Sequence, residues 1–245
     1  KNIMRIKTMS AALAALTILA ACSKQSGSEG NVSFALDQQS DLIDVSTKSS
    51  VGDFTALPSA SDFTVTISDE QDNITPVSDL SAPVTLAAGN YTATASYGSL
   101  SDEGFDKPCF KGEQSFAVTG GSSQTVTVRV KLAGCIVKFS FTEAFTNYFT
   151  DYTFNVTTGG GTAISVPKSE TRAIFMDAYT FKLSGTLTSQ SGATQTFAEK
   201  EFKNLEPATC YTVKFDASNV GSNSITISFD ETTIDADLVE VDLND

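Results

Sequence analysis

The sequence contains no histidine and no tryptophan. Without histidine, a Ser-His-Asp catalytic triad and the usual histidine-rich zinc sites are excluded. Without tryptophan, the protein lacks the strongest stacking platform for sugar rings, although tyrosine and phenylalanine can take that role. The glycine run 159–161 is not followed by the lysine and hydroxyl residue of a phosphate-binding loop. We therefore expect a protein that is not an enzyme and that uses no cofactor and no metal.

Basic residues are also few. The chain has 16 Lys and Arg against 29 Asp and Glu, which gives a net charge of −13. Such a surface repels nucleic acid and anionic lipid headgroups, so neither is an expected partner. Solubility is the simplest reason for the excess of acid, and the same reason serves for the acidic C-terminal tail.

A short apolar run, Ala11 to Ala21, follows the basic residues Arg5 and Lys7. As a helix it rises only about 16 Å, too little for a hydrocarbon core of about 30 Å. This layout is typical of a signal peptide and not of a membrane span. The run ends in Leu19-Ala20-Ala21-Cys22, which resembles the bacterial lipobox. We predict a signal peptide over residues 1–21, lipid attachment at Cys22, and a small, polar tether over residues 22–30.

The residues after Cys22 bear on the membrane to which a lipoprotein is sorted. By resemblance to lipoprotein sorting rules, Ser23 in place of an aspartate indicates the outer membrane. Surface-exported lipoproteins of Bacteroidetes carry an acidic cluster here, whereas this tether has only Glu29, preceded by Lys24. The periplasmic face and the cell surface therefore both remain open.

Cysteine is scarce, and three cysteines remain once Cys22 carries lipid. An odd number leaves at least one thiol without a disulfide partner. Cys135 is in register with apolar Val137 and is expected to be a small buried apolar residue. Cys109 lies in an expected loop, where a disulfide with Cys210 is an alternative to two free thiols.

Apolar and polar residues alternate with period two along most of the chain after residue 30. Because successive side chains of a strand point to opposite faces, each such run predicts a half-buried strand. The pattern predicts an all-β protein of two tandem antiparallel β-sandwich domains, over residues 31–132 and 133–245. A weak repeat of Leu86–Thr92 in Phe175–Thr180 supports two related domains. The expected inner faces hold Val65, Tyr91, Val128, Phe139, Phe154, Phe181, Val213 and Ile227.

Four segments have a characteristic order and spacing: Phe63–Ile67, Leu86–Tyr91, Gly104–Gly112 and Val128–Val137. Together they resemble a family of Bacteroidetes lipoproteins, domain of unknown function family 4493. The layout is also distantly similar to fimbrillins and fimbrial anchor proteins. That likeness implies transthyretin-like sandwiches and a role in fimbriae or adhesion, and it transfers no catalytic residue.

Two surface segments are candidate sites. In Gly104–Gly112, Phe105 and Phe110 can grip a ligand, together with Tyr148 elsewhere, or the two loop rings can close the end of a sandwich. The cluster Asp69, Glu70 and Asp72 offers oxygen ligands for calcium, but it lacks the EF-hand pattern. A solvated hairpin turn is therefore the preferred interpretation.

The leading hypothesis is an outer-membrane-anchored, non-catalytic lipoprotein that serves as a fimbria-like accessory or adhesion module. Its partners would be the membrane, through Cys22, and fimbrial subunits or glycans. One alternative is a glycan-binding lipoprotein for nutrient uptake, and a second is a hydrolase with a carboxylate pair. Cleavage after Lys48 would instead mark a polymerising subunit. We expect residues 32–36 to stay paired in the first domain and the protein to remain a monomer.

Overall fold

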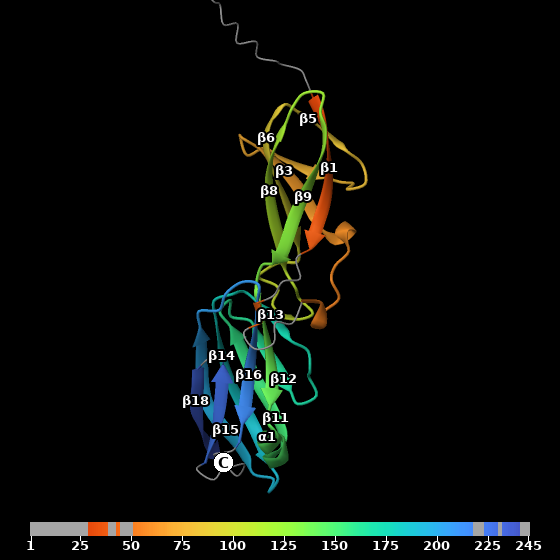
Figure 1. Cartoon of the computed structure of the whole chain (residues 1–245). Helices are drawn as coiled ribbons and strands as arrows, with labels where there is room; N and C mark the ends of the chain where they lie inside the picture. Colours follow the sequence, from red (N-terminus) through yellow and green to blue (C-terminus); the bar gives the residue numbers. More distant parts are fainter. Residues whose placement is uncertain (1–28, 39–42, 45–50, 218–222, 230–231, 241–245) are drawn as a thin grey trace, which may run out of the picture.

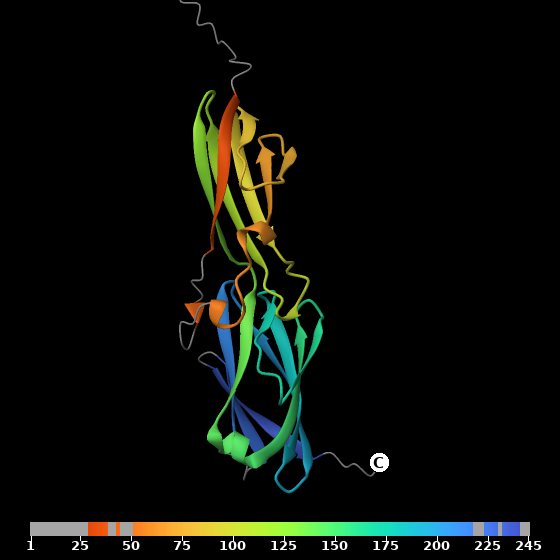
Figure 2. The same ribbon diagram turned by 90° about the vertical axis from the view of Figure 1, so that its right-hand side faces the viewer.

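The computed structural model describes residues 29–38, 43–44, 51–217, 223–229 and 232–240. Its strands form two large sheets, which lie end to end in an elongated molecule (Figure 1, Figure 2). The first unit holds most of the strands between residues 29 and 132, and the second unit holds those between residues 135 and 240 together with the short strands β2 and β7. The all-β fold expected from the alternation is confirmed. The boundary placed after residue 132 falls in the link between β9 and β10.

The first unit is a seven-stranded sheet in the order β4-β3-β6-β8-β9-β1-β5. Strand β1 pairs antiparallel with β5 over Glu29–Val32 and in parallel with β9 over Asn31–Gln38, so residues 32–36 are all paired with β9, as expected. The bounds are β1 (Glu29–Gln38), β3 (Thr64–Asp69), β4 (Ile74–Val77), β5 (Val84–Ala87), β6 (Gly89–Tyr97), β8 (Phe110–Val118) and β9 (Ser123–Leu132).

The second unit follows the order β12-β11-β14-β15-β18-β17-β16-β10-β13-β7, and β2 pairs with β16. Strand β18, which holds part of the acidic tail, pairs with β15 and β17. The bounds are β2 (Ile43–Asp44), β7 (Gly104–Phe105), β10 (Cys135–Phe141), β11 (Phe149–Thr158), β12 (Ala163–Pro167), β13 (Ile174–Met176), β14 (Thr180–Ser189), β15 (Thr194–Lys203), β16 (Thr209–Asp216), β17 (Ser224–Phe229) and β18 (Thr232–Glu240).

The strands of the two units are arranged in the same order. If the hairpin β17–β18 is set aside, β12-β11-β14-β15-β16-β10-β13 repeats the order of the first unit strand for strand. Each unit contains one long parallel pair, β1 with β9 and β10 with β16, among antiparallel neighbours. The repeat seen in the sequence falls on equivalent places, the passage from β5 into β6 and from β13 into β14.

The expected inner faces form the two cores. Six of the eight residues are buried, and Tyr91 and Phe139 are partly buried against the cores. Phe139 lies beyond Val137, where the pairing of β10 with β13 ends, so one side of β10 is less covered there. The six buried residues are Val65, Val128, Phe154, Phe181, Val213 and Ile227.

Among the residues that the structure describes, helix is limited to short pieces. The helix α1 (Glu143–Tyr148) begins where the side-chain oxygen of Thr142 accepts a hydrogen bond from the backbone N–H of Phe145, at 3.2 Å. Phe145 is fully buried, so α1 closes the far end of the second core. The other helical turns are η1 (Val51–Asp53) and η2 (Ala60–Asp62). Within the described ranges, no helix has the length and apolarity needed to cross a membrane.

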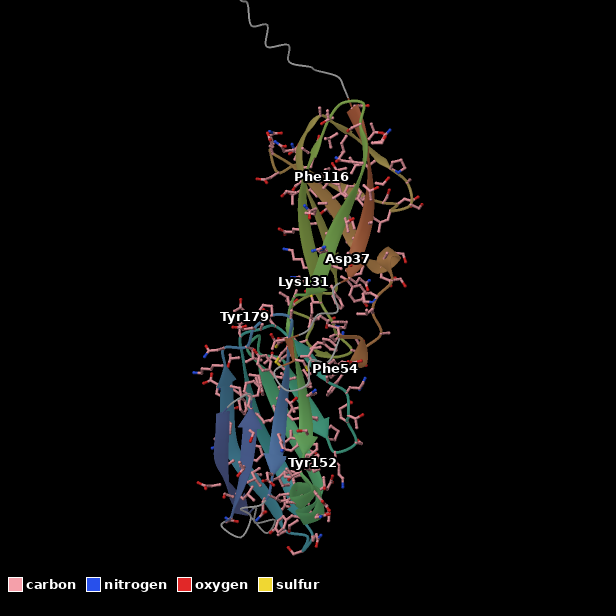
Figure 3. All side chains as sticks on the ribbon, viewed as in Figure 1. Asp37, Phe54, Phe116, Lys131, Tyr152 and Tyr179 are labelled. Carbon is pink, nitrogen blue, oxygen red and sulfur yellow. The ribbon has the colours of Figure 1, made fainter. Side chains whose placement is uncertain are left out.

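The junction between the units is built from both. Strand β10 places Cys135 and Val137 in the second core and Ile136, between them, in the first core. The loop from Gly98 to Cys109 leaves the first unit and adds β7 to the edge of the second sheet beside β13. The Lys138 ammonium of β10 lies 5.2 Å from the ring centre of Phe54. Figure 3 labels Phe54 near the junction of the two units.

Candidate binding surfaces

Two of the expected sites lie outside the described residues. They are Cys22, the expected lipid attachment site, and Lys48, the candidate processing site. Both stay predictions.

Phe105 lies in β7 and is used to dock the loop on the second unit. Its backbone pairs with Ile174, and its ring packs against the second core. The guanidinium of Arg172 lies 4.9 Å from the ring centre, while Arg172 also binds Asp106 at 2.6 Å. A ring covered in this way contributes to the junction.

Phe110 is fully buried in the first core, where its ring lies 6.3 Å from Phe63 and 6.4 Å from Tyr97 between ring centres. This position favours the packing role over a ligand role. Tyr148 is partly buried at the end of α1, with its ring 4.8 Å from that of Phe149. Because α1 is at the far end of the second unit (Figure 1), the three aromatic residues do not form one strip.

None of the cysteines at 109, 135 and 210 forms a disulfide in the structure. Cys135 and Cys210 are buried, and Cys109 is partly buried. Burial raises the pKa of the Cys135 thiol to about 12 and also raises the pKa of Cys109. The alternative of a Cys109–Cys210 bridge is not formed, and the buried apolar role expected for Cys135 agrees with its place in the second core.

The acidic cluster at the β3–β4 hairpin is occupied by its own turn. One carboxylate oxygen of Asp69 accepts the backbone N–H groups of Gln71 and Asn73, both at 2.9 Å, and the other accepts the Asn73 amide at 2.8 Å. The side-chain hydrogen bond from Asn73, with the backbone bonds, lowers the pKa of Asp69. These contacts favour the hairpin interpretation over a calcium site. The described part of the chain contains no cluster of three or more metal-ligating side chains.

The outer face of β3 and β6 is lined by hydroxyl groups, and β8 adds Ser115 beside the ion pair of Lys111 and Glu113. The strand register places Ser68, Thr92 and Ser115 in one row across the three strands. The side-chain oxygens of Thr92 and Ser115 lie 3.2 Å apart. We call this surface the hydroxyl face, and it consists of Thr64, Thr66, Ser68, Thr92, Thr94, Ser96 and Ser115.

A shallow hollow of about 400 Å³ lies at one end of the hydroxyl face. The Asn90 amide donates to a carboxylate oxygen of Glu70 at 2.7 Å on its border. Tyr91 and Phe116 also line it, but they alternate with Thr92 and Ser115 and stack on each other at 5.7 Å on the core side. The side chains that project from the outer face here are therefore polar.

A second hollow, of about 320 Å³, lies at the junction of the units. Glu103, from the loop of the first unit, accepts the Asp177 backbone N–H at 3.0 Å with one carboxylate oxygen. The other oxygen accepts the Thr158 hydroxyl. These two bonds fix the relative position of the walls. The junction hollow is lined by Leu100, Ser101, Glu103, Gly160, Thr162 and Asp177.

Tyr179 stands beside the junction hollow and was missed as a candidate site. The alternation with Phe181 and Leu183 indicates an inward-facing strand residue, but β14 begins only at Thr180 and Tyr179 is 67% exposed. Its backbone N–H donates to the Asp177 carbonyl at 3.1 Å, and Figure 3 labels it at the level of the junction. The sequence signal that could have identified Tyr179 as exposed is the turn that precedes β14.

The comparisons with known proteins now identify the family. A family model described as "Domain of unknown function (DUF4493)" matches residues 28–244. The chain belongs to the DUF4493 family. No curated protein matches this member of the family.

Several solved structures are similar to this DUF4493 chain at low identity. One, from Bacteroides thetaiotaomicron, is named as a candidate polysaccharide-binding protein; it has 14% identity and a TM-score of 0.41, covering 89% of this chain and 99% of that chain. Two others are named as candidate cell adhesion proteins. The one from B. thetaiotaomicron has 14% identity, a TM-score of 0.45 and coverage of 77% and 94%. The one from Bacteroides uniformis has 10% identity, a TM-score of 0.46 and coverage of 82% and 96%.

Proposed function

We propose that the protein is a lipid-anchored, non-catalytic adhesion or interaction protein of the outer membrane. The lipobox at Cys22 provides the anchor, and the two end-to-end units provide a rod that carries binding surfaces. The histidine-free composition argues against histidine-dependent hydrolysis.

The observation that carries this proposal is the position of the N-terminal end of β1. Strand β1 begins at the end of the first unit that is farthest from the junction (Figure 1). Seven residue steps separate Cys22 from Glu29, so a fully extended tether would span at most about 25 Å. A lipid on Cys22 would therefore hold that end near the membrane and leave the second unit and the junction projecting outward.

The test compares cells that make the wild-type protein with cells that make Cys22→Ala. We expect metabolic palmitate label and membrane association in the wild type, and loss of both in the variant. Palmitate label that persists in Cys22→Ala would contradict the anchor. Adherence of intact cells to glycan-coated and cell-coated surfaces is then measured with and without the gene. Unchanged adherence to every surface would contradict the adhesion role, and protease treatment of intact cells separates the two membrane faces.

The hydroxyl face favours a second candidate function, the capture of glycans for uptake. Hydroxyl side chains in rows can exchange hydrogen bonds with the hydroxyl groups of an extended saccharide, each side chain acting as donor and acceptor. In that case Thr92→Val together with Ser115→Ala should lower growth on the captured polysaccharide and leave adherence unchanged. Equal growth of the double variant and the wild type would argue against uptake.

A further inference from the structure

We propose that the junction hollow is a binding site for an uncharged saccharide, with Tyr179 as the ring on which the sugar packs. The inference deepens the proposed function, since it names the ligand class for one surface of an adhesion protein. It rests on the cavity at the junction, on the exposed apolar side chains beside it and on the polar groups that line it.

Exposed large apolar side chains, which form the apolar part of the site, are few in the described part of this protein. The described residues leave four large apolar side chains exposed, and Leu100, at 37%, lines the junction hollow. Tyr179, at 67%, does not line it but is bonded through its backbone N–H to the carbonyl of Asp177, which does. The position that a Cβ atom on Gly159 would take lies 3.4 Å from the Tyr179 Cβ atom, so Tyr179 rises directly beside the turn that supplies Gly160. An exposed ring next to a cavity offers a flat apolar surface to the C–H face of a sugar.

The polar part of the site supplies acceptors and donors for sugar hydroxyl groups. Glu103 and Asp177 present carboxylates, and Thr162 and Ser101 present hydroxyl groups. Each Glu103 oxygen accepts one bond from the protein and retains a further lone pair. Gly160 keeps one of these oxygens uncovered, because a Cβ atom at Gly160 would lie 3.0 Å from it.

The size and charge of the junction hollow narrow the ligand. About 320 Å³ is at the lower end of the range for small-molecule pockets and suits one or two sugar rings. Both charged groups in the lining are carboxylates, and the chain as a whole carries −13. Sialylated, sulfated and uronic acid sugars would be repelled, so the expected ligand carries no negative charge.

The experiment uses the full lipidated chain, purified in detergent, on an array of neutral and acidic oligosaccharides, followed by titration with the neutral saccharide that binds best. We expect saturable binding of neutral saccharides. Tyr179→Ala should weaken the affinity about five- to tenfold, as expected for the loss of one aromatic packing contact. Thr162→Val keeps the shape and removes a hydroxyl, and it should weaken binding as well, whereas Tyr179→Phe should bind within about twofold of the wild type.

Leu57→Ala is the matched control, because Leu57 is 39% exposed and belongs neither to the junction hollow nor to the hydroxyl face. Its affinity should equal that of the wild type. The proposal is overturned if no saccharide binds, if acidic saccharides bind best, or if a Lys- and Arg-rich peptide displaces the bound saccharide and binds more tightly. It is also overturned if Tyr179→Ala and Thr162→Val bind as the wild type does. Any of these results can coexist with intact anchoring and adherence, so failure of the saccharide site is distinguishable from failure of the proposed function.

Discussion

At the scale of single residues, Gly112 is the glycine of the first unit at which an added Cβ atom would lie closest to another strand's backbone. A Cβ atom at this position would lie 2.0 Å from the carbonyl oxygen of Arg129 and 3.0 Å from the Cα atom of Val130. Backbone atoms of a paired strand cannot move aside without disturbing their hydrogen bonds. We therefore expect Gly112→Ala to lower the free energy of unfolding by about 1–3 kcal/mol, as overpacking does elsewhere.

Urea unfolding measures this effect, and Gly89→Ala is the matched control. A Cβ atom at Gly89 meets only the ring of Tyr91, at 3.6 Å, which is an ordinary contact. Both variants restrict the unfolded chain in the same way, so their difference reports the clash in the folded state. Equal midpoints for the two variants would mean that β8 and β9 do not approach as closely as described.

Phe110 is the residue for which folding and binding roles are separated most directly. Its side chain is fully buried, so Phe110→Ala should lower the free energy of unfolding by about 3–5 kcal/mol. Tyr179→Ala, at a site that is 67% exposed, should change it by less than about 0.5 kcal/mol. Thermal and urea unfolding of the two variants provide the comparison. A fully stable Phe110→Ala protein with impaired saccharide binding would restore the ligand role.

These two residues also mark what alternation can predict. Period two identifies the inward face of a strand, so Val65, Phe154 and Phe181 were predictable from the sequence and are buried. It cannot place a residue just outside a strand. Tyr179 continues the alternation but precedes β14, and its exposure depends on a turn held by a hydrogen bond to the Asp177 carbonyl.

At the scale of elements, the contact between β7 and β13 is stabilised by charged groups on its outer side. Arg172 binds Glu170 at 2.7 Å and Asp106 at 2.6 Å, so one guanidinium joins the loop of the first unit to the segment before β13. The side-chain hydrogen bond from Arg172 lowers the pKa of Glu170 to about 2. About half of the Arg172 side chain is exposed, so water screens the interaction and its contribution to stability is modest.

The lowered pKa predicts an acid dependence with a definite sign. Glu170 has a pKa near 4.3 in the unfolded chain, above its folded value of about 2. Its stabilising contribution is therefore complete above about pH 5 and is lost as the pH falls toward 2. The wild type should be more stable than Glu170→Gln at neutral pH, and the difference should shrink over that acid range.

Urea unfolding at a series of pH values checks this, with Glu113→Gln as a control for the loss of a surface carboxylate in the first unit. A difference between the wild type and Glu170→Gln that stays constant from pH 7 to pH 2 would show that the carboxylate does not act through its charge.

The pairing of elements was only partly predictable. Alternation located most strands and the repeat located equivalent turns, but neither carries the direction of a neighbouring strand. The parallel pairs β1–β9 and β10–β16 arise because strands far apart in the sequence become neighbours. The pairing of β7 with the second sheet was unpredictable for the same reason. Phe105 can pack against the second core only when both units are folded.

At the scale of the whole molecule, contacts between the two units make them one mechanical body, and strand β10 contributes because its successive residues pack in different cores. A lipid anchor at one end of a flexible pair of domains would leave the far domain without a fixed direction. The units are joined at several points. These are strand β10, the hydrogen bonds of Glu103 with Thr158 and Asp177, and the packing of Phe105 against the second core. A rod joined in this way holds the walls of the junction hollow at a fixed separation.

The adjacent residues Ile136 and Val137 test this coupling. Both are fully buried, but Ile136 packs in the first core and Val137 in the second. We expect one calorimetric transition for the wild type, and a lower single transition for each variant, because loss of either core contact weakens a body that unfolds together. Ile136→Ala should cost about 2–5 kcal/mol, as typical for a buried isoleucine.

Hydrogen exchange then separates the two sides of β10. Ile136→Ala should reduce amide protection most in β1 and β9 of the first unit, although residue 136 belongs to a strand of the second sheet. Val137→Ala should reduce it most in β14 and β15, because local openings follow the core that has lost a side chain. Two separate transitions in the wild type, with Ile136→Ala lowering only that of the second unit, would mean that the first core ends at β9. In that case the junction would be a hinge between independent domains, and the junction hollow would have no fixed shape to offer a ligand.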